Sequence, residues 1–240
     1  MPRRTLIADV AIGALAAPLT ALPAAAAIRE YDLAVERRTI DVAGSTAIGL
    51  TVNGGLPGPT LRFTEGDTAR IRVRNALEEE TSIHWHGVLV PPGMDGVPLL
   101  SFPPIAPGAT STYEFPVRQS GTYWYHSHTT LQEQIGIYGA LVIDPRDAAR
   151  GADRDHVVLF SDWTHEDPGE VNRTLRRGSP WYALARGGAQ SLSGAARLGR
   201  LGDFFKRELQ RMPPMDIADV GYDHFLANGR PEITLDGEPG

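Results

Sequence analysis

The stretch ARIRVRN, residues 69–75, decides the fold class. In it, Ile71 and Val73 alternate with arginines, and successive side chains of a β-strand point to opposite faces. One face of this strand is therefore expected to join a core, while the arginines form a solvated face. A helix would instead repeat its apolar residues at three- and four-residue spacings.

Short segments of the same kind occur on both sides of this strand, between residues 28 and 145. They are rich in β-branched and aromatic residues, and turn signals such as Asn53-Gly54 and Pro107-Gly108 separate them. Glycine and proline are in excess, with 26 and 19 residues. This pattern predicts an all-β Greek-key sandwich or barrel. The segments are IREYDLAV (28–35), AIGLTVNG (47–54), TLRFTEG (60–66), STYEFPVR (111–118), GTYWYHSH (121–128) and GALVIDP (139–145).

The composition excludes several kinds of site. The 240 residues include no cysteine, so this chain forms no disulfide, iron–sulfur cluster, Cys-ligated zinc site, thiol nucleophile or blue-copper centre. Lys and Arg total 23 against 29 Asp and Glu, which gives a net charge of −6. The sequence shows no clustered basic face, so a nucleic-acid partner is not expected. A hydrophobic content of 42% is that of a globular chain of one or two domains.

Residues 1–27 have the layout of a secretory signal peptide, with two arginines, a moderately apolar stretch and small residues ending near Ala27. Arg3-Arg4 favours export by the twin-arginine route, and a general secretory signal is the alternative. Either signal predicts a periplasmic or otherwise extracytoplasmic protein. Asp9 interrupts the apolar stretch, and no later window approaches the roughly 18 apolar residues of a membrane span. A stable membrane anchor is therefore not expected.

The alternation is lost after residue 146, so residues 28–146 are expected to form one domain. Over residues 167–211, apolar side chains instead recur three and four residues apart, as in an amphipathic helix. We expect a helical insertion packed on the sheet there, rather than a membrane or partner helix.

Two further strands are predicted around this insertion. One lies within residues 153–163, and the other is residues 223–227, which a turn at Asn228-Gly229 follows. Two strands are too few for a stable sandwich. Residues 147–240 are therefore expected to comprise a linker, the helical insertion and the truncated start of a second β domain.

The chemistry lies in two histidine pairs, His84-x-His86 and His126-x-His128. Positions i and i+2 of a strand face the same way and are about 6.6 Å apart, so each pair suits two neighbouring metal ions better than one. If the two strands are neighbours, four imidazoles converge on one patch. An all-nitrogen donor set favours copper or zinc. One such pair is a weak signal, but two pairs beside aromatic residues strongly indicate a metal cluster.

The same motifs carry a family resemblance. They closely resemble the amino-terminal cupredoxin domain of multicopper oxidases, and some downstream motifs resemble the bacterial copper-resistance branch of that family. The resemblance implies a cupredoxin-like fold and a copper enzyme that reduces dioxygen to water while it oxidises a substrate. The residues that carry it are TSIHWHG (81–87), MDGVP (94–98), GTYWYHSH (121–128), GALVIDP (139–145), SDWT (161–164), MDIADV (215–220) and LANG (226–229).

The resemblance also implies residue roles. In the family, four histidines from the first domain and four from the last hold a trinuclear copper cluster. By motif, His84 corresponds to a type 2 copper ligand, His86 and His126 to ligands of one type 3 copper, and His128 to a ligand of its type 3 partner. Asp95 occupies the place of an acidic residue that helps to deliver protons, which suits a reaction that consumes protons and electrons. An Asp-Gly turn is the alternative interpretation of Asp95.

The chain departs from the family pattern in one respect. Multicopper oxidases accept electrons through a type 1 copper held by one cysteine and two histidines, and this chain has no cysteine. By itself it is therefore expected to hold half of the trinuclear site and to be catalytically inactive. The reducing substrate, which in the family is cuprous ion or a phenol, would react in the region that this chain lacks.

Three interpretations remain open. The chain is the amino-terminal part of a copper-resistance type multicopper oxidase, a stand-alone extracytoplasmic protein that sequesters copper, or a half-enzyme completed by a separately encoded carboxy-terminal chain. A zinc-binding β-barrel of another family is a more distant alternative. Copper ions and dioxygen are the expected ligands, and a carboxy-terminal domain is the expected partner.

The remaining histidines and two methionines have simpler interpretations. His156, His165 and His224 are isolated in the sequence, next to acidic residues, and are expected to be surface or core histidines. The spacing of Met212 and Met215 suits a cuprous ion, but the two prolines between them favour a loop.

Overall fold

The structure is a computed structural model that describes residues 26–147, 154–177, 182, 192–209 and 220–235. All but the last two residues of the expected signal segment lie outside the described residues, as do Met212 and Met215. No helix in the described ranges has the length and apolar character needed to cross a membrane.

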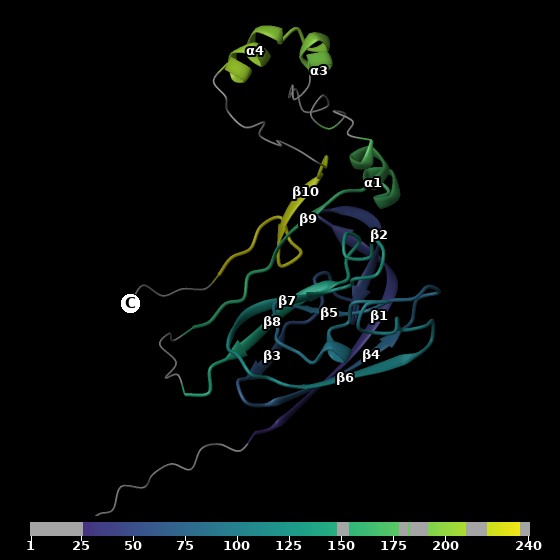
Figure 1. Ribbon diagram of the computed structural model, residues 1–240, viewed down its shortest axis with the longest axis vertical. Coiled ribbons are helices and arrows are strands. Elements are labelled where there is room, and N and C mark those ends of the chain that lie inside the picture. The colour runs from purple at the N-terminus through teal and green to yellow at the C-terminus, as the bar shows by residue number, and fades with distance from the viewer. Residues whose placement is uncertain (1–25, 148–153, 178–181, 183–191, 210–219, 236–240) are drawn as a thin grey trace, which may run out of the picture.

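Strands account for much of residues 28–144, and they form two four-stranded sheets (Figure 1). The strands are β1 (Ile28–Val42), β2 (Ser45–Val52), β3 (Leu61–Thr64), β4 (Thr68–Asn75), β5 (His84–His86), β6 (Thr110–Pro116), β7 (Gly121–His126) and β8 (Tyr138–Asp144). One sheet has the order β2-β1-β4-β6 and the other β3-β8-β7-β5. β1 pairs with β4 and β3 with β8 in parallel, and the remaining neighbours in these sheets are antiparallel. The predicted all-β sandwich is thus confirmed, and the sheets do not close into a barrel.

The hydrophobic core combines side chains from both sheets. Ile71 and Val73 of β4 are fully buried, as their alternation with arginine predicts. Trp85, Tyr125 and Leu141 of the other sheet belong to the same cluster. Full burial of an aliphatic side chain contributes about 1.5–3 kcal/mol, so this shared layer is the main source of stability for the sandwich.

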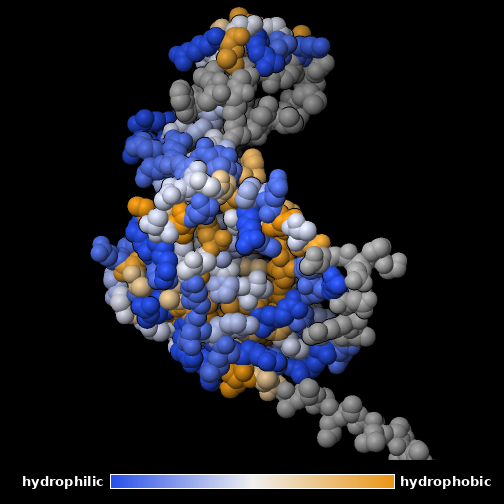
Figure 2. Space-filling model, turned by 180° about the vertical axis from the view of Figure 1, so that it is seen from behind, coloured by the Kyte–Doolittle hydropathy of each residue, from blue (hydrophilic) through white to orange (hydrophobic). Residues whose placement is uncertain are grey.

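The arginines of β4 form ion pairs on the outer surface of their sheet. Arg70 contacts Glu30 at 2.8 Å and Glu114 at 2.7 Å, and Arg72 contacts Asp32 at 2.5 Å. Exposed pairs of this kind each contribute little to stability. They form the solvated face that the alternation predicts. Hydrophilic side chains likewise dominate the face of the molecule seen in Figure 2, with smaller hydrophobic patches between them.

Beyond the sandwich, β9 (Phe160–Trp163) and β10 (His224–Ala227) form an antiparallel pair. Asn228 and Gly229 follow β10 with positive φ angles of 50° and 76°, as expected for the predicted turn. Both predicted strands of this region are present, although β9 is shorter than the apolar segment that predicted it. Trp163 and Leu226 pack with Val42 in a small second core.

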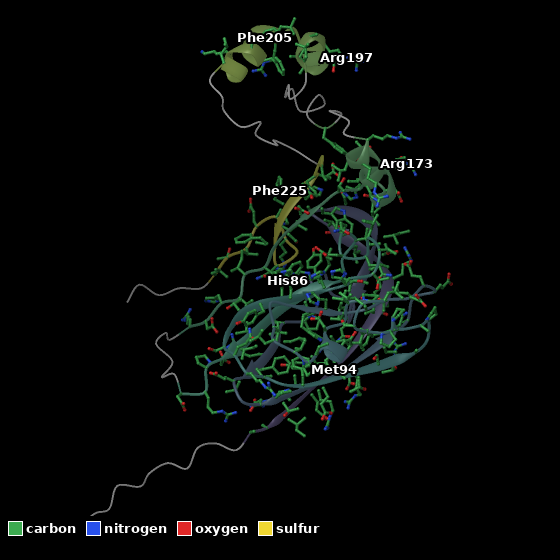
Figure 3. All side chains as sticks on the ribbon, viewed as in Figure 1. His86, Met94, Arg173, Arg197, Phe205 and Phe225 are labelled. Atoms are coloured by element: carbon green, nitrogen blue, oxygen red, sulfur yellow. The ribbon has the colours of Figure 1, made fainter. Side chains whose placement is uncertain are left out.

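In the described residues, the expected helical insertion includes three short helices, α1 (Pro168–Arg176), α3 (Leu192–Arg197) and α4 (Leu201–Leu209). Gly199, with a φ of 67°, lies between α3 and α4 and interrupts the helical pattern. The expected packing on the sheet is not observed for α3 and α4, which contact each other and lie apart from both sheets in Figure 1. Phe205 of α4 accordingly remains 54% exposed (Figure 3).

Candidate metal centre

Strands β5 and β7 bring the two histidine pairs together. They are antiparallel neighbours in which His84 lies opposite His126 and His86 lies opposite Trp124. Positions i and i+2 of a strand share a face, so His84, His86 and His126 project from the same side of the sheet. His128 follows just after the end of β7. The convergence expected for neighbouring strands is therefore observed; Figure 3 labels His86 within this sheet.

The four imidazole rings form a compact cluster. The centroid of the His84 ring lies 5.6 Å from that of His86, 5.5 Å from that of His126 and 5.6 Å from that of His128. One ring nitrogen from each of His84, His86 and His126 lies within 4.8 Å of the others. Metal–nitrogen bonds are about 2 Å long, so two nitrogens on one ion are at most about 4 Å apart. The 3.2 Å between Nδ1 of His86 and Nε2 of His126 is within this limit.

Hydrogen bonds set the tautomers of two of these rings. Nδ1 of His126 donates to the backbone oxygen of Ser127 at 2.9 Å, and Nδ1 of His84 donates to the backbone oxygen of Asp95 at 2.7 Å. A carbonyl oxygen only accepts, so Nδ1 carries the proton in both rings and Nε2 keeps a lone pair. The Nε2 lone pair of His126 points toward Nδ1 of His86, at 3.2 Å.

The cluster is buried on one side and open on the other. His126 is 6% exposed and His84 is half-buried, whereas His86 and His128 are exposed. Desolvation of the buried part of its ring, together with the neighbouring His126 and His84, lowers the pKa of His86. Neutral imidazole is the form that binds a metal ion, so this shift favours ligation by His86.

Asp95 lies directly behind His84. Besides the hydrogen bond to its backbone oxygen, its Oδ1 is 3.4 Å from Nδ1 of His84. A short 3-10 helix, η1 (Pro92–Met94), precedes it, and Gly96 follows with a φ of 74°. A Cβ at Gly96 would lie 1.8 Å from the backbone oxygen of Ile83, so only glycine fits. Asp95 is therefore part of a turn and also a neighbour of His84.

A buried polar network fixes the segment that follows β7. Gln132 is 1% exposed, and its side-chain oxygen accepts hydrogen bonds from the hydroxyls of Thr81 at 2.8 Å and Ser127 at 2.9 Å. Its amide group donates to the backbone oxygen of Glu80 at 2.8 Å. This network ties the segment that carries His128 to the chain just before β5. A lone glutamine in a loop gives no signal of burial, so the sequence alone does not predict this network.

Two further side chains beside the cluster are not predicted as site residues from the sequence. The ring of Trp124 stacks on His126, with centroids 4.2 Å apart, and on His86, with centroids 5.0 Å apart. Oε2 of Glu133 lies 2.8 Å from Nδ1 of His126. Trp124 is one of the aromatic residues beside the second histidine pair, and that neighbourhood is the sequence signal that could have identified it. No sequence pattern pointed to Glu133.

His165 and His224 lie close together at the ends of β9 and β10, with ring centroids 5.8 Å apart. Asp223 accepts a hydrogen bond from the backbone amide of His165 at 2.7 Å. Within the described parts of the chain, however, only one group of three or more histidine, aspartate or glutamate side chains has metal-binding spacing. It consists of His84, His86 and His126. His165, which is exposed, and His224, which is half-buried, therefore do not belong to the histidine cluster and keep their interpretation as surface or core histidines.

Comparison with known proteins points to the same region. The family model "Multicopper oxidase" matches residues 34–148. Copper resistance protein A of Pseudomonas syringae pv. tomato is 43% identical over 216 residues, which cover 87% of this chain and 36% of that protein. The Escherichia coli protein of the same name is 44% identical over 218 residues, with the same shares. The chain thus spans little more than a third of the length of these relatives.

Solved structures agree with the sequence matches. A laccase from Botrytis aclada has a TM-score of 0.57 and 43% identity, covering 65% of this chain and 30% of that one. A multicopper oxidase from Pseudomonas thermotolerans has a TM-score of 0.56 and 31% identity, covering 61% of this chain and 39% of that one. These likenesses confirm the cupredoxin-like fold expected from the sequence.

Proposed function

Because the chain belongs to the multicopper oxidase family through its domain at residues 34–148, we propose that it supplies half of the trinuclear copper cluster at which dioxygen is reduced to water. The ligands are His84, His86, His126 and His128. The similarity to copper resistance protein A supports a role in copper resistance or homeostasis.

The observation that carries this proposal is the contact between Nδ1 of His86 and Nε2 of His126, at 3.2 Å. Since His126 already carries its proton on Nδ1, its Nε2 offers a lone pair to this space. His86 and His126 would hold a copper ion through these facing nitrogens, with His86 in the tautomer that leaves Nδ1 unprotonated. The two residues are also the ones that the family resemblance assigns to a single type 3 copper.

The donor set fits copper. All four side chains are imidazoles, the ligand type that suits copper and zinc, and no thiolate is available in the sequence. Bound copper would supply the electrons that dioxygen accepts. The protein's own part is to hold the imidazoles at ligand spacing, to set their tautomers and to stack Trp124 against two of the rings.

Asp95 is the residue that we assign to proton delivery. Its side chain is 32% exposed, so it contacts water on one side and the ring of His84 on the other. A carboxyl group in that position can pass a proton from the solvent toward the cluster. The turn that carries Asp95 runs so close to Ile83 that a Cβ at Gly96 would lie 1.8 Å from the Ile83 backbone oxygen.

The open side of the cluster supports the proposal that the remaining ligands come from outside this chain. His86 and His128 are exposed, and a type 1 copper requires a cysteine that the 240 residues do not contain. We assign the electron-accepting site and the other four histidines to a carboxy-terminal region, either in the same protein or in a separate chain. The relatives, which extend well beyond the matched region, support this assignment.

Copper sequestration without turnover is the second candidate, because the cluster of three closely spaced imidazoles is built from this chain alone. In both cases we propose an extracytoplasmic location, which the signal-like residues 1–27 support.

Copper titration of the metal-free chain tests the proposal. We expect the wild type to bind copper and a His84→Ala/His128→Ala variant to lose that binding. A wild type that binds only adventitious copper, or a variant that binds as well as the wild type, contradicts copper binding by this cluster. Oxygen consumption with cuprous ion or a phenol separates the two candidates. If the chain is part of an oxidase, it should consume oxygen only together with a cysteine-containing carboxy-terminal region. If it sequesters copper, adding such a region should produce no oxygen consumption.

A further inference from the structure

Glu133 places a carboxylate behind the most buried histidine of the cluster. Its Oε2 lies 2.8 Å from Nδ1 of His126, whereas Nε2 of the same ring faces His86. Because His126 is 6% exposed, water screens this charge only in part. Neither a sequence motif nor the family resemblance pointed to this residue.

The loop between β7 and β8 holds Glu133 in place. Its neighbour Gln132 is fixed by the buried network with Thr81 and Ser127. The backbone oxygen of Glu133 also accepts a hydrogen bond from the amide of Gly136 at 3.1 Å. The side chain is 35% exposed, so one edge of the carboxylate remains hydrated while the other contacts the ring.

The arrangement repeats the one at His84, the residue opposite His126 in the strand pair. Nδ1 of His84 faces the backbone oxygen of Asp95 at 2.7 Å and its Oδ1 at 3.4 Å. Nδ1 of His126 faces the backbone oxygen of Ser127 at 2.9 Å and Oε2 of Glu133 at 2.8 Å. Each of the two cross-strand partners therefore has a carbonyl and a carboxylate behind it, with the carboxylate closer at His126.

We propose that Glu133 is a positioning residue of the copper site, which holds the ring of His126 with Nδ1 protonated and Nε2 directed toward His86. This inference rests on the proposed copper binding. The Ser127 carbonyl accepts the proton of Nδ1, and the carboxylate of Glu133, 2.8 Å from the same nitrogen, favours that proton by its charge. The carboxylate also makes Nε2 a stronger donor and balances the positive charge of a bound ion, as carboxylates behind ligating histidines do.

Two variants and one control test this role in the full chain. Glu133→Ala removes the carboxylate, and Glu133→Gln keeps an accepting oxygen without the charge. Glu78→Gln removes the same charge from an exposed glutamate elsewhere on the surface. The affinity for Cu²⁺ is measured by competition with a chelator, and the tautomer of His126 is read from its ring nitrogen signals by NMR in the metal-free chain.

We expect the wild-type His126 to carry its proton on Nδ1. Copper binding should weaken by about tenfold or more in Glu133→Ala, and by less in Glu133→Gln. Glu78→Gln should match the wild type. The ring signals of His126 should shift in both Glu133 variants, while those of His84 stay unchanged. Glu133→Gln, which preserves the shape of the side chain, decides the question if Glu133→Ala does not fold.

Two results would overturn the positioning role: a wild-type His126 protonated on Nε2, or a copper affinity of the Glu133 variants equal to that of the wild type. Failure of the proposed function gives a different result, because the wild type itself would then bind no stoichiometric copper. The difference in His126 ring signals between the metal-free wild type and Glu133→Gln still tests the role of Glu133 in that case.

Discussion

Nδ1 of His86 and Nε2 of His126 face each other at 3.2 Å, although the two residues are not opposite each other in the sheet. In the register of β5 and β7, His126 pairs with His84, and His86 pairs with Trp124. The contact between the two rings is therefore diagonal, a distance that long side chains can span in an antiparallel pair. This diagonal approach directs two ring nitrogens into the same space and makes the pair the centre of the proposed copper site.

Removing either member of this pair should weaken copper binding strongly. We expect His86→Ala and His126→Ala each to lower the affinity for Cu²⁺ by about tenfold or more, because each deletes a ligand and leaves the facing nitrogen without a partner. Isothermal titration calorimetry on the metal-free chain measures the effect. The control is His156→Ala, which removes an exposed histidine outside the cluster and should leave the affinity unchanged. Equal affinities in all three variants would contradict the assignment.

Substitution of Gly96 should disturb the site from behind. A Cβ at this position would lie 1.8 Å from the backbone oxygen of Ile83, at a φ of 74°, so Gly96→Ala must displace the turn that carries Asp95. We expect a loss of about 1–3 kcal/mol in the free energy of unfolding, measured with urea, and weaker copper binding. Gly93→Ala is the matched control, because a Cβ there meets nothing within 4 Å. Similar stability of the two variants would argue against this packing.

Truncation of Gln132 should destabilise the segment after β7. Gln132→Ala removes the partner of the Thr81 and Ser127 hydroxyls and of the Glu80 carbonyl. A buried polar group left without a hydrogen bond costs about 1–3 kcal/mol, so we expect at least that loss in urea unfolding. Gln134→Ala, at an exposed position two residues away, should have little effect. A neutral result for Gln132→Ala would show that the network does not stabilise this segment.

Asp67 should make the stability of the sandwich depend on pH in the acidic range. Burial by itself raises the pKa of Asp67, but hydrogen bonds from the Ala27 amide, Arg29 and Arg146 outweigh it and hold the pKa below its usual value. The folded-state pKa is thus lower than the unfolded one, which is about 3.9. The stabilisation is therefore present above about pH 4 and is lost as the pH falls through the folded-state pKa.

The matching experiment is thermal unfolding of Asp67→Asn between neutral and acid pH. The variant should melt at a lower temperature than the wild type at pH 7. This difference in melting temperature should shrink as the pH falls below the pKa of a free carboxyl group. Asp147→Asn changes an exposed carboxylate and should leave the profile unchanged. A constant difference between Asp67→Asn and the wild type at every pH would contradict the ionic role of Asp67.

The sequence predicts the parts of the fold that depend on local patterns. Alternation of Ile71 and Val73 with arginine predicts a strand with one buried face, and the structure confirms it. The i and i+2 spacing of His84 and His86 predicts a shared face, and the register with β7 supplies the second pair. These features depend on neighbouring residues, so a single sequence carries them.

The sequence does not predict the features that depend on tertiary contacts. Glu133, in the loop between β7 and β8, lies 2.8 Å from Nδ1 of His126, and no pattern in the sequence predicts that contact. His165 and His224 appear isolated along the chain, yet the pairing of β9 with β10 brings them together. The helical periodicity of residues 167–211 indicates helices but does not indicate where they break or what they contact.

X-ray absorption of the copper-loaded chain tests the central claim most directly, because it reports the atoms bound to the metal. We expect imidazole nitrogens to surround the copper, and this signal to be lost when His84, His86, His126 and His128 are all replaced by alanine. Copper surrounded mainly by oxygen, or a spectrum that the fourfold variant leaves unchanged, would contradict the claim that these four histidines form the copper site.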